Sequence, residues 1–166
     1  MIISVQPLSP GDHGDAIAII NAAARWYREF LPEDELHDPE MSEAEWGRES
    51  ERMTWFGAFD NGALVGVASL EYVADVALLR HAYVLRAYQR QGTGSLLTRA
   101  LEDAAQGVDR IIVGTYRDNY KARGALEKLG YVECEDSDAV LRAYYAILDD
   151  RRETSVAYEK RRVDGS

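Results

Sequence analysis

The sequence has few of the residues that several protein classes depend on. Cys134 is the only cysteine, so no disulfide can form within the chain, and the composition fits a reducing compartment. Basic residues are also scarce, because 19 lysines and arginines stand against 29 aspartates and glutamates, a formal net charge of −10 at pH 7. Such a surface repels phosphate on average. We therefore expect neither nucleic acid nor a membrane as a general partner.

Long apolar runs, targeting segments and linkers are missing as well. No apolar run approaches the roughly 20 residues that a membrane-spanning helix needs. The first ten residues lack the basic segment and apolar stretch of a signal peptide, which indicates a cytoplasmic protein. Repeats, low-complexity tracts and interdomain linkers are not found. A chain of 166 residues suits one domain, so residues 1–166 are predicted to form a single domain.

What the sequence does contain is an alternation of strand and helix patterns. Strands are predicted over Ile2–Gln6, Thr54–Phe59, Ala63–Val73, Val76–Leu85, Arg110–Tyr116, Tyr131–Glu135 and Glu153–Lys160. Helices are predicted from a cap at Asp12 as far as Leu31, over about Glu43–Arg52, from Gly94 to a stop near Gly107, and from Asn119 to Gly130. An apolar segment, Val140–Leu148, precedes the last strand. This order predicts a mixed α/β fold.

Local residue signals support several of these boundaries. Ser42 and Glu45 have the spacing of a capping box at the start of the second helix. The pair Asn61-Gly62 lies between two strand patterns, and both residues tolerate positive φ, so an antiparallel hairpin is expected there. Gly130 has the place of a glycine just beyond a helix C-terminus.

The stretch from Val76 to Ala105 predicts a strand, a glycine-containing turn and a helix. Such a turn presents main-chain N–H groups that have no partner within the helix, backed by the positive end of the helix dipole, and can hold a diphosphate. Gly92 and Gly94 suit that role because the absent Cβ lets oxygen atoms approach the backbone. A tight turn that only joins a strand to a helix explains the same residues. A dinucleotide fingerprint is excluded because Leu97 stands where its third glycine belongs, and the Gly-Lys-Ser/Thr ending of a P-loop is missing.

Two segments resemble the motifs of one family. The segment Tyr83-Val84-Leu85-Arg86-Ala87-Tyr88-Gln89-Arg90-Gln91-Gly92-Thr93-Gly94 is similar to the coenzyme A motif of the GNAT superfamily of N-acetyltransferases, Gln/Arg-x-x-Gly-x-Gly/Ala after a strand end. The segment Asn119 to Tyr131 resembles the second GNAT motif, Asn-x-x-Ala followed by a helix that ends in glycine and an aromatic residue. The order of elements along nearly the whole chain is also that of the family.

The resemblance implies a fold and a co-substrate. The fold would be α/β (α+β), with a mixed, mostly antiparallel central sheet of about six to seven strands, splayed at the cofactor site and flanked by about four helices. Acetyl-coenzyme A would be the co-substrate, and no metal is expected. The residues implied to bind it are Ala82, Tyr83 and Val84 along the pantetheine arm, Gln89, Arg90, Gln91, Gly92, Thr93, Gly94 and Ser95 around the diphosphate, and Asn119 beside the arm. A helix cap is the alternative role for Asn119.

The expected activity is acetyl transfer to a primary amine of an unidentified small molecule or peptide by direct attack. An amine of pKa near ~10 must lose a proton before it attacks. Many relatives have a tyrosine acid seven residues after the motif asparagine, and some have a glutamate base five residues before it. These positions are Leu126 and Gly114 here. The candidates to replace them are Glu71, Tyr116 and Tyr120, although a solvent-facing carboxylate and packing tyrosines explain the same residues.

Other features leave alternatives open. The acidic stretch Pro32–Glu40 would favour a cationic acceptor if it lined the acceptor site, but a solvated surface loop is the preferred interpretation of the same residues. His81 and Cys134 are interpreted as packing residues. Because two common catalytic positions are empty, an acyl-coenzyme A sensor or regulatory module without transferase activity is a second hypothesis. A purely structural protein is a third, and a homodimer is possible because many relatives dimerise.

Overall fold

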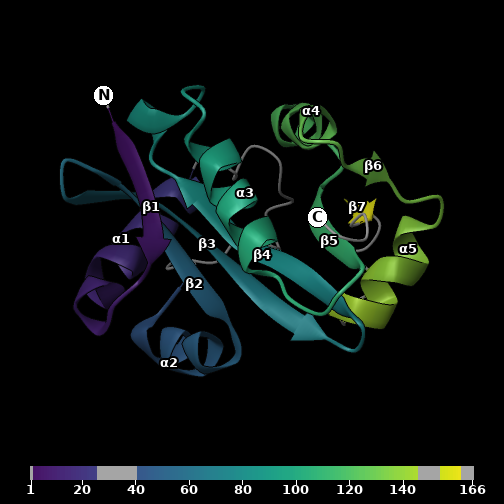
Figure 1. The fold of residues 1–166 in the computed structure, drawn as a ribbon, viewed down its shortest axis with the longest axis horizontal. Coiled ribbons are helices and arrows are strands. Elements are labelled where there is room, and N and C mark those ends of the chain that lie inside the picture. The colour runs from purple at the N-terminus through teal and green to yellow at the C-terminus, as the bar shows by residue number, and fades with distance from the viewer. Residues whose placement is uncertain (1, 26–40, 146–153, 162–166) are drawn as a thin grey trace. The chain divides into compact units, whose positions relative to one another are not determined.

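The computed structural model describes residues 2–25, 41–145 and 154–161 (Figure 1). The strands are β1 (Ile3–Pro7), β2 (Thr54–Asp60), β3 (Ala63–Val73), β4 (Val76–Val84), β5 (Arg110–Tyr116), β6 (Val132–Glu133) and β7 (Ser155–Arg161). The α-helices of the described residues are α1 (His13–Ala24), α2 (Glu43–Arg52), α3 (Thr93–Ala104), α4 (Tyr120–Lys128) and the short α5 (Ser137–Val140). None of these helices is long and apolar enough to cross a membrane.

The seven described strands follow the order β1-β2-β3-β4-β5-β7-β6. The pairs β1–β2, β2–β3, β5–β7 and β6–β7 are antiparallel, whereas β4 and β5 are parallel. A parallel pair needs a crossover connection, and α3 provides it. The prediction of an α/β fold with a mixed, mostly antiparallel sheet is confirmed.

The chain forms two compact units. The first, unit 1, contains residues 1–71 and 80–105, and the second, unit 2, contains residues 72–79 and 106–166. The expected single domain stays a prediction.

Unit 1 has helices on both faces of its strands. Val67 and Trp55 lie in a buried cluster with Trp46 of α2 and residues of α1. Gly66 faces the opposite way, since a Cβ built on it would lie 3.2 Å from the side chain of Leu97 in α3. Adjacent residues of a strand point to opposite faces, so β3 separates the two layers.

Unit 1 also contains a side-chain bond between α1 and the residue before the α2 cap. The carboxamide of Asn21 donates to the carbonyl oxygen of Met41 at 3.0 Å and accepts from the Met41 N–H at 2.7 Å. Met41 is buried. One side chain therefore holds both main-chain groups of Met41.

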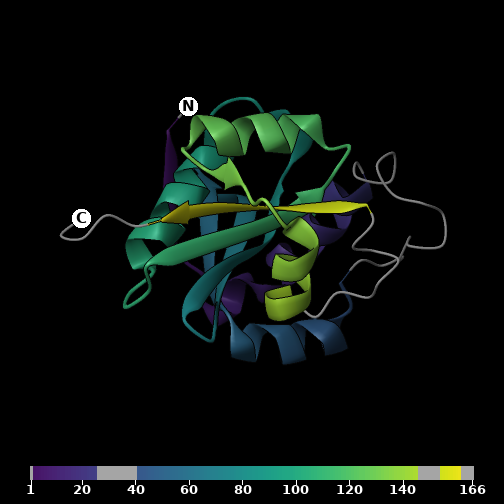
Figure 2. The same cartoon turned by 90° about the vertical axis from the view of Figure 1, so that its right-hand side faces the viewer.

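Unit 2 is layered in the same way. One face of the β5–β7 pair carries Ile112 and Ala157, which pack in a buried cluster with Leu141. The other face carries Tyr158, which is fully buried and whose hydroxyl accepts from Arg123 Nε of α4 at 3.0 Å. Figure 2 shows α4 and α5 on opposite sides of these strands.

The local boundary signals are confirmed. The Ser42 hydroxyl accepts from the Glu45 N–H at 3.1 Å and caps α2. Asn61 and Gly62 have φ of 50° and 85° in the turn between β2 and β3. Gly130, with φ of 96°, follows α4 and donates its N–H to a carbonyl oxygen of the last helical turn.

Other predictions differ from the structure. The carboxylate of Asp12 accepts from the N–H and hydroxyl of Ser9, at 3.0 and 2.9 Å, and makes no side-chain bond to α1. Asp12 stands at the N-cap of α1 as predicted, but its side chain does not bond to the helix, because it accepts from the Ser9 donors three residues before it and closes the 3₁₀ turn Pro10–Asp12 instead. These bonds, the main-chain one first, lower the pKa of Asp12. The predicted extension of the first helix to Leu31 lies outside the described residues.

The C-terminal predictions are shifted in their bounds. The strand expected over Tyr131–Glu135 is shortened to Val132–Glu133, because α5 begins soon afterwards, with Asp136 Oδ1 accepting from the Ala139 N–H as its cap. The described part of the segment Val140–Leu148 is helical as far as residue 145.

Candidate functional site

The end of β4 runs into a turn that is shaped by its own side chains. After Val84, a single 3₁₀ turn, Arg86–Tyr88, leads toward α3. The side-chain amide of Gln89 donates to the Val84 carbonyl oxygen at 3.0 Å and folds the turn back on the strand end. The side chain of Gln91 similarly donates to the Ala87 carbonyl oxygen at 3.0 Å.

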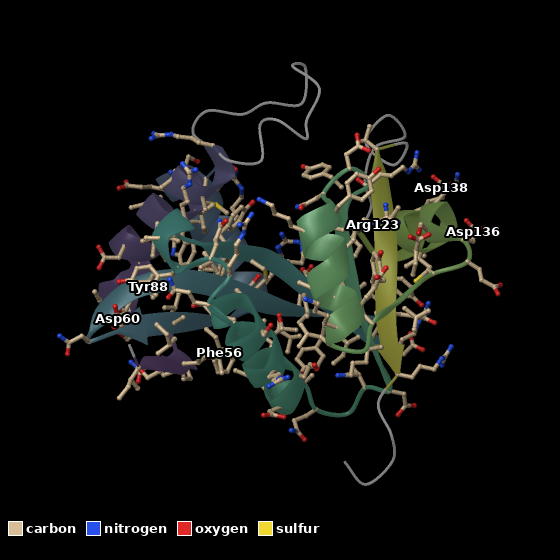
Figure 3. The ribbon with its side chains drawn as sticks, turned by 90° about the horizontal axis from the view of Figure 1, so that it is seen from above. Phe56, Asp60, Tyr88, Arg123, Asp136 and Asp138 are labelled. Atoms are coloured by element: carbon tan, nitrogen blue, oxygen red, sulfur yellow. The ribbon has the colours of Figure 1, made fainter. Side chains whose placement is uncertain are left out.

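A tyrosine fixes the same turn to the hairpin between β2 and β3. The hydroxyl of Tyr88 donates to Asp60 Oδ2 at 2.7 Å, and Figure 3 shows the two labelled side chains together. The hydrogen bond to Asp60 raises the pKa of Tyr88, because it stabilises the neutral phenol. The bond joins residues 28 apart. No local sequence pattern indicates a pairing of Tyr88 with Asp60.

The backbone of the turn is left-handed at two residues. Arg90 has φ of 64° and Gly92 has φ of 84°. Left-handed φ is costly for residues with a Cβ, so Arg90 is a strained residue and glycine suits the second position. A Cβ built on Gly92 or Gly94 would meet no protein atom within 4 Å. The space beside both glycines is therefore open.

The N-terminus of α3 presents main-chain donors to this space. The N–H of Leu96 bonds to the Gly92 carbonyl oxygen at 3.0 Å, and this is the first bond of the helix ladder. The N–H groups of Thr93, Gly94 and Ser95 precede it and have no acceptor within the helix. The helix has no side-chain cap. The turn thus combines three N–H donors with the positive end of the helix dipole.

The side chain of Thr93, the first residue of α3, is buried. Thr93 is 1% exposed, and its hydroxyl has no hydrogen-bond partner among the described residues. A buried hydroxyl without a partner is costly, so this group is an exception among the buried polar atoms of the fold. The sequence analysis included Thr93 only through its place in the motif, because burial of the hydroxyl has no sequence signature.

The residues expected along the cofactor arm occupy the end of β4. Ala82 is exposed, whereas Tyr83 and Val84 are half-buried. Tyr83 packs against the buried cluster of α1, α2 and β2. Gly66 lies beside this strand end, since a Cβ on it would come within 3.3 Å of the Tyr83 carbonyl oxygen. A side chain at Gly66 would disturb this part of β4.

Asn119 begins α4 in unit 2. Its Oδ1 accepts from the Ala122 N–H at 3.2 Å, and the residue is 5% exposed. The structure therefore shows the helix cap, the alternative role for this residue. The cap uses Oδ1 and not Nδ2.

Glu71, the first catalytic candidate, lies in unit 1 within an ion-pair network. The residue is 8% exposed. Its carboxylate contacts Arg80 Nη1 at 2.9 Å and Arg52 Nη1 at 3.3 Å. Each carboxylate oxygen therefore has a guanidinium partner. To act as a base, Glu71 would have to release one of them. The alternative of a solvent-facing side chain is wrong, since Glu71 is buried.

The two tyrosine candidates lie in unit 2, near Asn119. Tyr116 ends β5, and its carbonyl oxygen accepts from the Asn119 N–H at 3.1 Å. Tyr120 is 70% exposed, and the guanidinium of Arg123 lies 5.7 Å from its ring centroid. Tyr120 is thus no core residue, and its hydroxyl has access to solvent.

The two positions without the usual catalytic residues are both packed. Leu126 is 8% exposed, and its carbonyl oxygen accepts from the Tyr131 N–H at the end of α4. A Cβ on Gly114 would lie 3.3 Å from Leu141 Cδ2 and 3.7 Å from Tyr145 Cζ. A longer side chain at Gly114 would therefore displace its neighbours.

The remaining candidates do not gather into a second site. Within residues 2–25, 41–145 and 154–161, no three His, Cys, Asp or Glu side chains are placed to hold a metal ion. Cys134 is buried in the cluster of unit 2, and burial raises the pKa of its thiol. The acidic stretch Pro32–Glu40 lies outside the described residues.

Comparisons with known proteins agree with this arrangement. The sequence profile described as "Acetyltransferase (GNAT) family" matches residues 20–131, more than half of the chain. No curated protein sequence matches the chain.

Several solved structures share the fold. The PaiA N-acetyltransferase of Thermoplasma acidophilum, solved with coenzyme A, superposes with a TM-score of 0.76 and 18% identity over 98% of this chain and 100% of that one. The ribosomal-protein-S18-alanine N-acetyltransferase of Escherichia coli has a TM-score of 0.71 and 23% identity over 99% of both chains. The N-acetylglutamate synthase of Neisseria gonorrhoeae, in complex with coenzyme A and N-acetyl-glutamate, has a TM-score of 0.68 and 17% identity over 97% of this chain and 35% of that one.

Proposed function

Because the chain belongs to the acetyltransferase (GNAT) family, we propose that it is an N-acetyltransferase. It would move an acetyl group from acetyl-coenzyme A to the primary amine of a small molecule or peptide. When bound, acetyl-coenzyme A supplies the activated acetyl group. The residues of the chain bind and orient the reactants and take up the proton of the amine.

The observation that carries this proposal is the unsatisfied N-terminus of α3. Its N–H groups at Thr93, Gly94 and Ser95 and the buried Thr93 hydroxyl are donors that fit the diphosphate of coenzyme A. The open space beside Gly92 and Gly94 allows close approach. This local donor set would allow a chain whose net charge is −10 to bind a diphosphate.

The end of β4 would position the other end of the co-substrate. We propose that the main chain of Ala82, Tyr83 and Val84 pairs with the pantetheine arm as an added strand would. The N–H of Val84 would donate to the thioester carbonyl oxygen as negative charge develops on it. The thiolate has an intrinsic pKa near ~8.5 and can leave without a fixed acid.

Proton removal from the amine has three candidates in this proposal. Tyr120 is the most accessible, with its hydroxyl in solvent, and Tyr116 lies four residues before it at the end of β5. Glu71 would need to exchange an arginine partner for the amine. A water molecule could take the proton instead, because positioning alone can supply much of the rate enhancement.

The proposal is tested by comparing two glycines that both have positive φ. Gly92 and Gly107 have φ of 84° and 72°, and a Cβ on either meets no protein atom within 4 Å. Gly92→Ala and Gly107→Ala should each lower the free energy of unfolding by about 1–2 kcal/mol through left-handed strain. Only Gly92→Ala should weaken binding of acetyl-coenzyme A, by about tenfold or more, in titration calorimetry. No heat with the wild-type chain, or equal affinity in both variants, would contradict the proposal.

A second candidate function is supported by the packed positions Leu126 and Gly114 and by the paired carboxylate of Glu71. With these groups, the chain would be an acyl-coenzyme A sensor without transferase activity. Release of free thiol from acetyl-coenzyme A across a panel of amines distinguishes the two. Acceptor-dependent release supports the enzyme, and tight binding without such release supports the sensor.

A further inference from the structure

Strand β1 is the outermost strand at one end of the strand order (Figure 1). Just after β1, the Leu8 N–H donates to the Trp55 carbonyl oxygen at 3.1 Å and continues the β1–β2 register. Antiparallel strands bond through alternate residues, so the even-numbered residues of β1 point their main-chain groups toward β2. The N–H and C=O groups of Ile3 and Val5 therefore point away from β2, and no strand of the described residues pairs with them.

This edge lacks the features that usually protect an exposed strand. Charged side chains, bulges and very short strands are the common forms of protection. β1 has five residues, and its register with β2 has no bulge. Residues 2–11 contain no charged side chain, although the chain has a formal net charge of −10. Ser4 is exposed, and Ile2 is 86% exposed. The edge is thus open to pairing with another strand.

The strands at the other end of the order are protected. β6 has only two residues. Beyond it, the Ala157 carbonyl oxygen of β7 accepts from the Cys134 N–H at 2.9 Å, and the Ala157 N–H donates to the Ser137 hydroxyl at 3.0 Å. The exposed residues of this stretch include Glu133, Glu135, Asp136 and Asp138, the last two labelled in Figure 3. Only the edge of β1 therefore combines length with a lack of charge.

The main-chain pattern of β1 is complementary to itself. In an antiparallel pair of two β1 strands, Ile3 of one copy can lie opposite Val5 of the other. Each of these residues presents one N–H and one C=O, so the pair forms four hydrogen bonds and leaves none of these groups over. Pro7, which has no N–H, lies beyond the paired positions. In this register Ser4 of one copy lies directly opposite Ser4 of the other.

The charge of the chain favours a second copy at this edge over a charged partner. Two copies that each carry −10 repel one another on average, and an uncharged strand is where this repulsion is weakest. An acidic or basic peptide would find no charge to pair with on β1.

We propose that β1 is the surface through which two copies of this chain associate, paired antiparallel across a two-fold axis at Ser4. A five-residue strand buries less area than the interface of a stable dimer, so the dimer is a transient one. The inference does not depend on the proposed function.

The test places charges at Ser4, where the two copies meet. Self-association of the full chain is measured by analytical ultracentrifugation at protein concentrations up to about 1 mM. Ser4→Lys and Ser4→Glu each place two like charges directly opposite and should weaken the dimer about fivefold. An equimolar mixture of the two variants places lysine opposite glutamate and should restore the dimer. Ser4→Ala, which adds no charge, should associate like the wild type.

A second pair of variants controls for net charge. Ala18 is exposed on α1, and Ala18→Lys and Ala18→Glu change the net charge by the same amounts as the Ser4 variants. Association through β1 predicts that neither Ala18 variant disrupts the dimer and that mixing them has no effect. A wild-type chain that is monomeric at about 1 mM, or a mixture of Ser4 variants that associates no better than each alone, would overturn the proposal.

Discussion

Two connections in this molecule have the same order, a strand, a turn and a helix, but their helix N-termini differ. In the connection from β4 to α3, Gly92 stands at the N-cap and no side chain caps the helix. In the connection from β5 to α4, Asn119 stands at the N-cap and its Oδ1 accepts from the Ala122 N–H. The first leaves its donors open and the second satisfies one with its own side chain. An open N-terminus is a cost in stability that a ligand can offset.

The largest effect is expected from removing the orphaned hydroxyl of the open connection. Thr93→Val keeps the shape of the side chain and should weaken acetyl-coenzyme A binding about tenfold, while the free energy of unfolding stays equal or rises. Thr98→Val is the control, because its hydroxyl already donates to the Gly94 carbonyl oxygen at 2.9 Å. Calorimetry and urea unfolding measure both quantities. Equal affinity in the two variants would mean that the Thr93 hydroxyl has no ligand.

In the connection from β5 to α4, removing the capping side chain should lower the stability of the protein. Asn119→Ala removes the cap and should lower the free energy of unfolding by about 1 kcal/mol, as measured by urea unfolding. Asn119→Ser keeps a capping oxygen and should preserve stability. Since the cap leaves Nδ2 unused, the serine variant should also bind acetyl-coenzyme A about threefold more weakly. Full affinity in Asn119→Ser would assign Asn119 to the cap alone.

The smallest change in acetyl-coenzyme A affinity is expected from removing the hydrogen bond between Tyr88 and Asp60, which fixes the turn before α3. Tyr88→Phe removes the contact with Asp60 and should weaken acetyl-coenzyme A binding about threefold at pH 7. Because the bond raises the pKa of Tyr88, its contribution is complete below the unfolded value near ~10 and is lost as pH rises through the raised folded value.

The difference in affinity between wild type and Tyr88→Phe should therefore disappear at high pH. Tyr72→Phe is the control, since the Tyr72 hydroxyl accepts from the Gln106 N–H in unit 2. A difference that persists above the raised pKa would show that the ring, and not the hydroxyl bond, shapes the turn.

The comparison also shows what the sequence could predict. Strand and helix order, the hairpin at Asn61-Gly62 and the caps at Ser42 and Asn119 were predicted because each depends on residues a few positions apart. Asp12 stands at the N-cap of α1, but its carboxylate bonds to Ser9, because local spacing does not decide between two nearby partners, the helix amide and Ser9.

Contacts between distant residues were beyond the sequence. The Tyr145 hydroxyl lies beside Leu79, 66 residues earlier, and the Tyr88 hydroxyl beside Asp60, 28 residues earlier. Glu71 was a catalytic candidate with a solvent-facing side chain as its alternative, and only the fold brings Arg52 and Arg80 to its carboxylate. Such pairings depend on strand register and burial, which residue spacing does not contain.

The pair of hydrogen bonds between Asn21 and Met41 has a consequence for how the protein can be altered. Arg25 is the C-terminal cap of α1, and Met41 is fixed by the carboxamide of Asn21. A segment inserted between these two residues would therefore begin at the end of α1 and end at a residue that is held in place. Closing a longer connection costs little extra entropy. An exchange of residues between these two points therefore leaves both hydrogen bonds of Met41 in place.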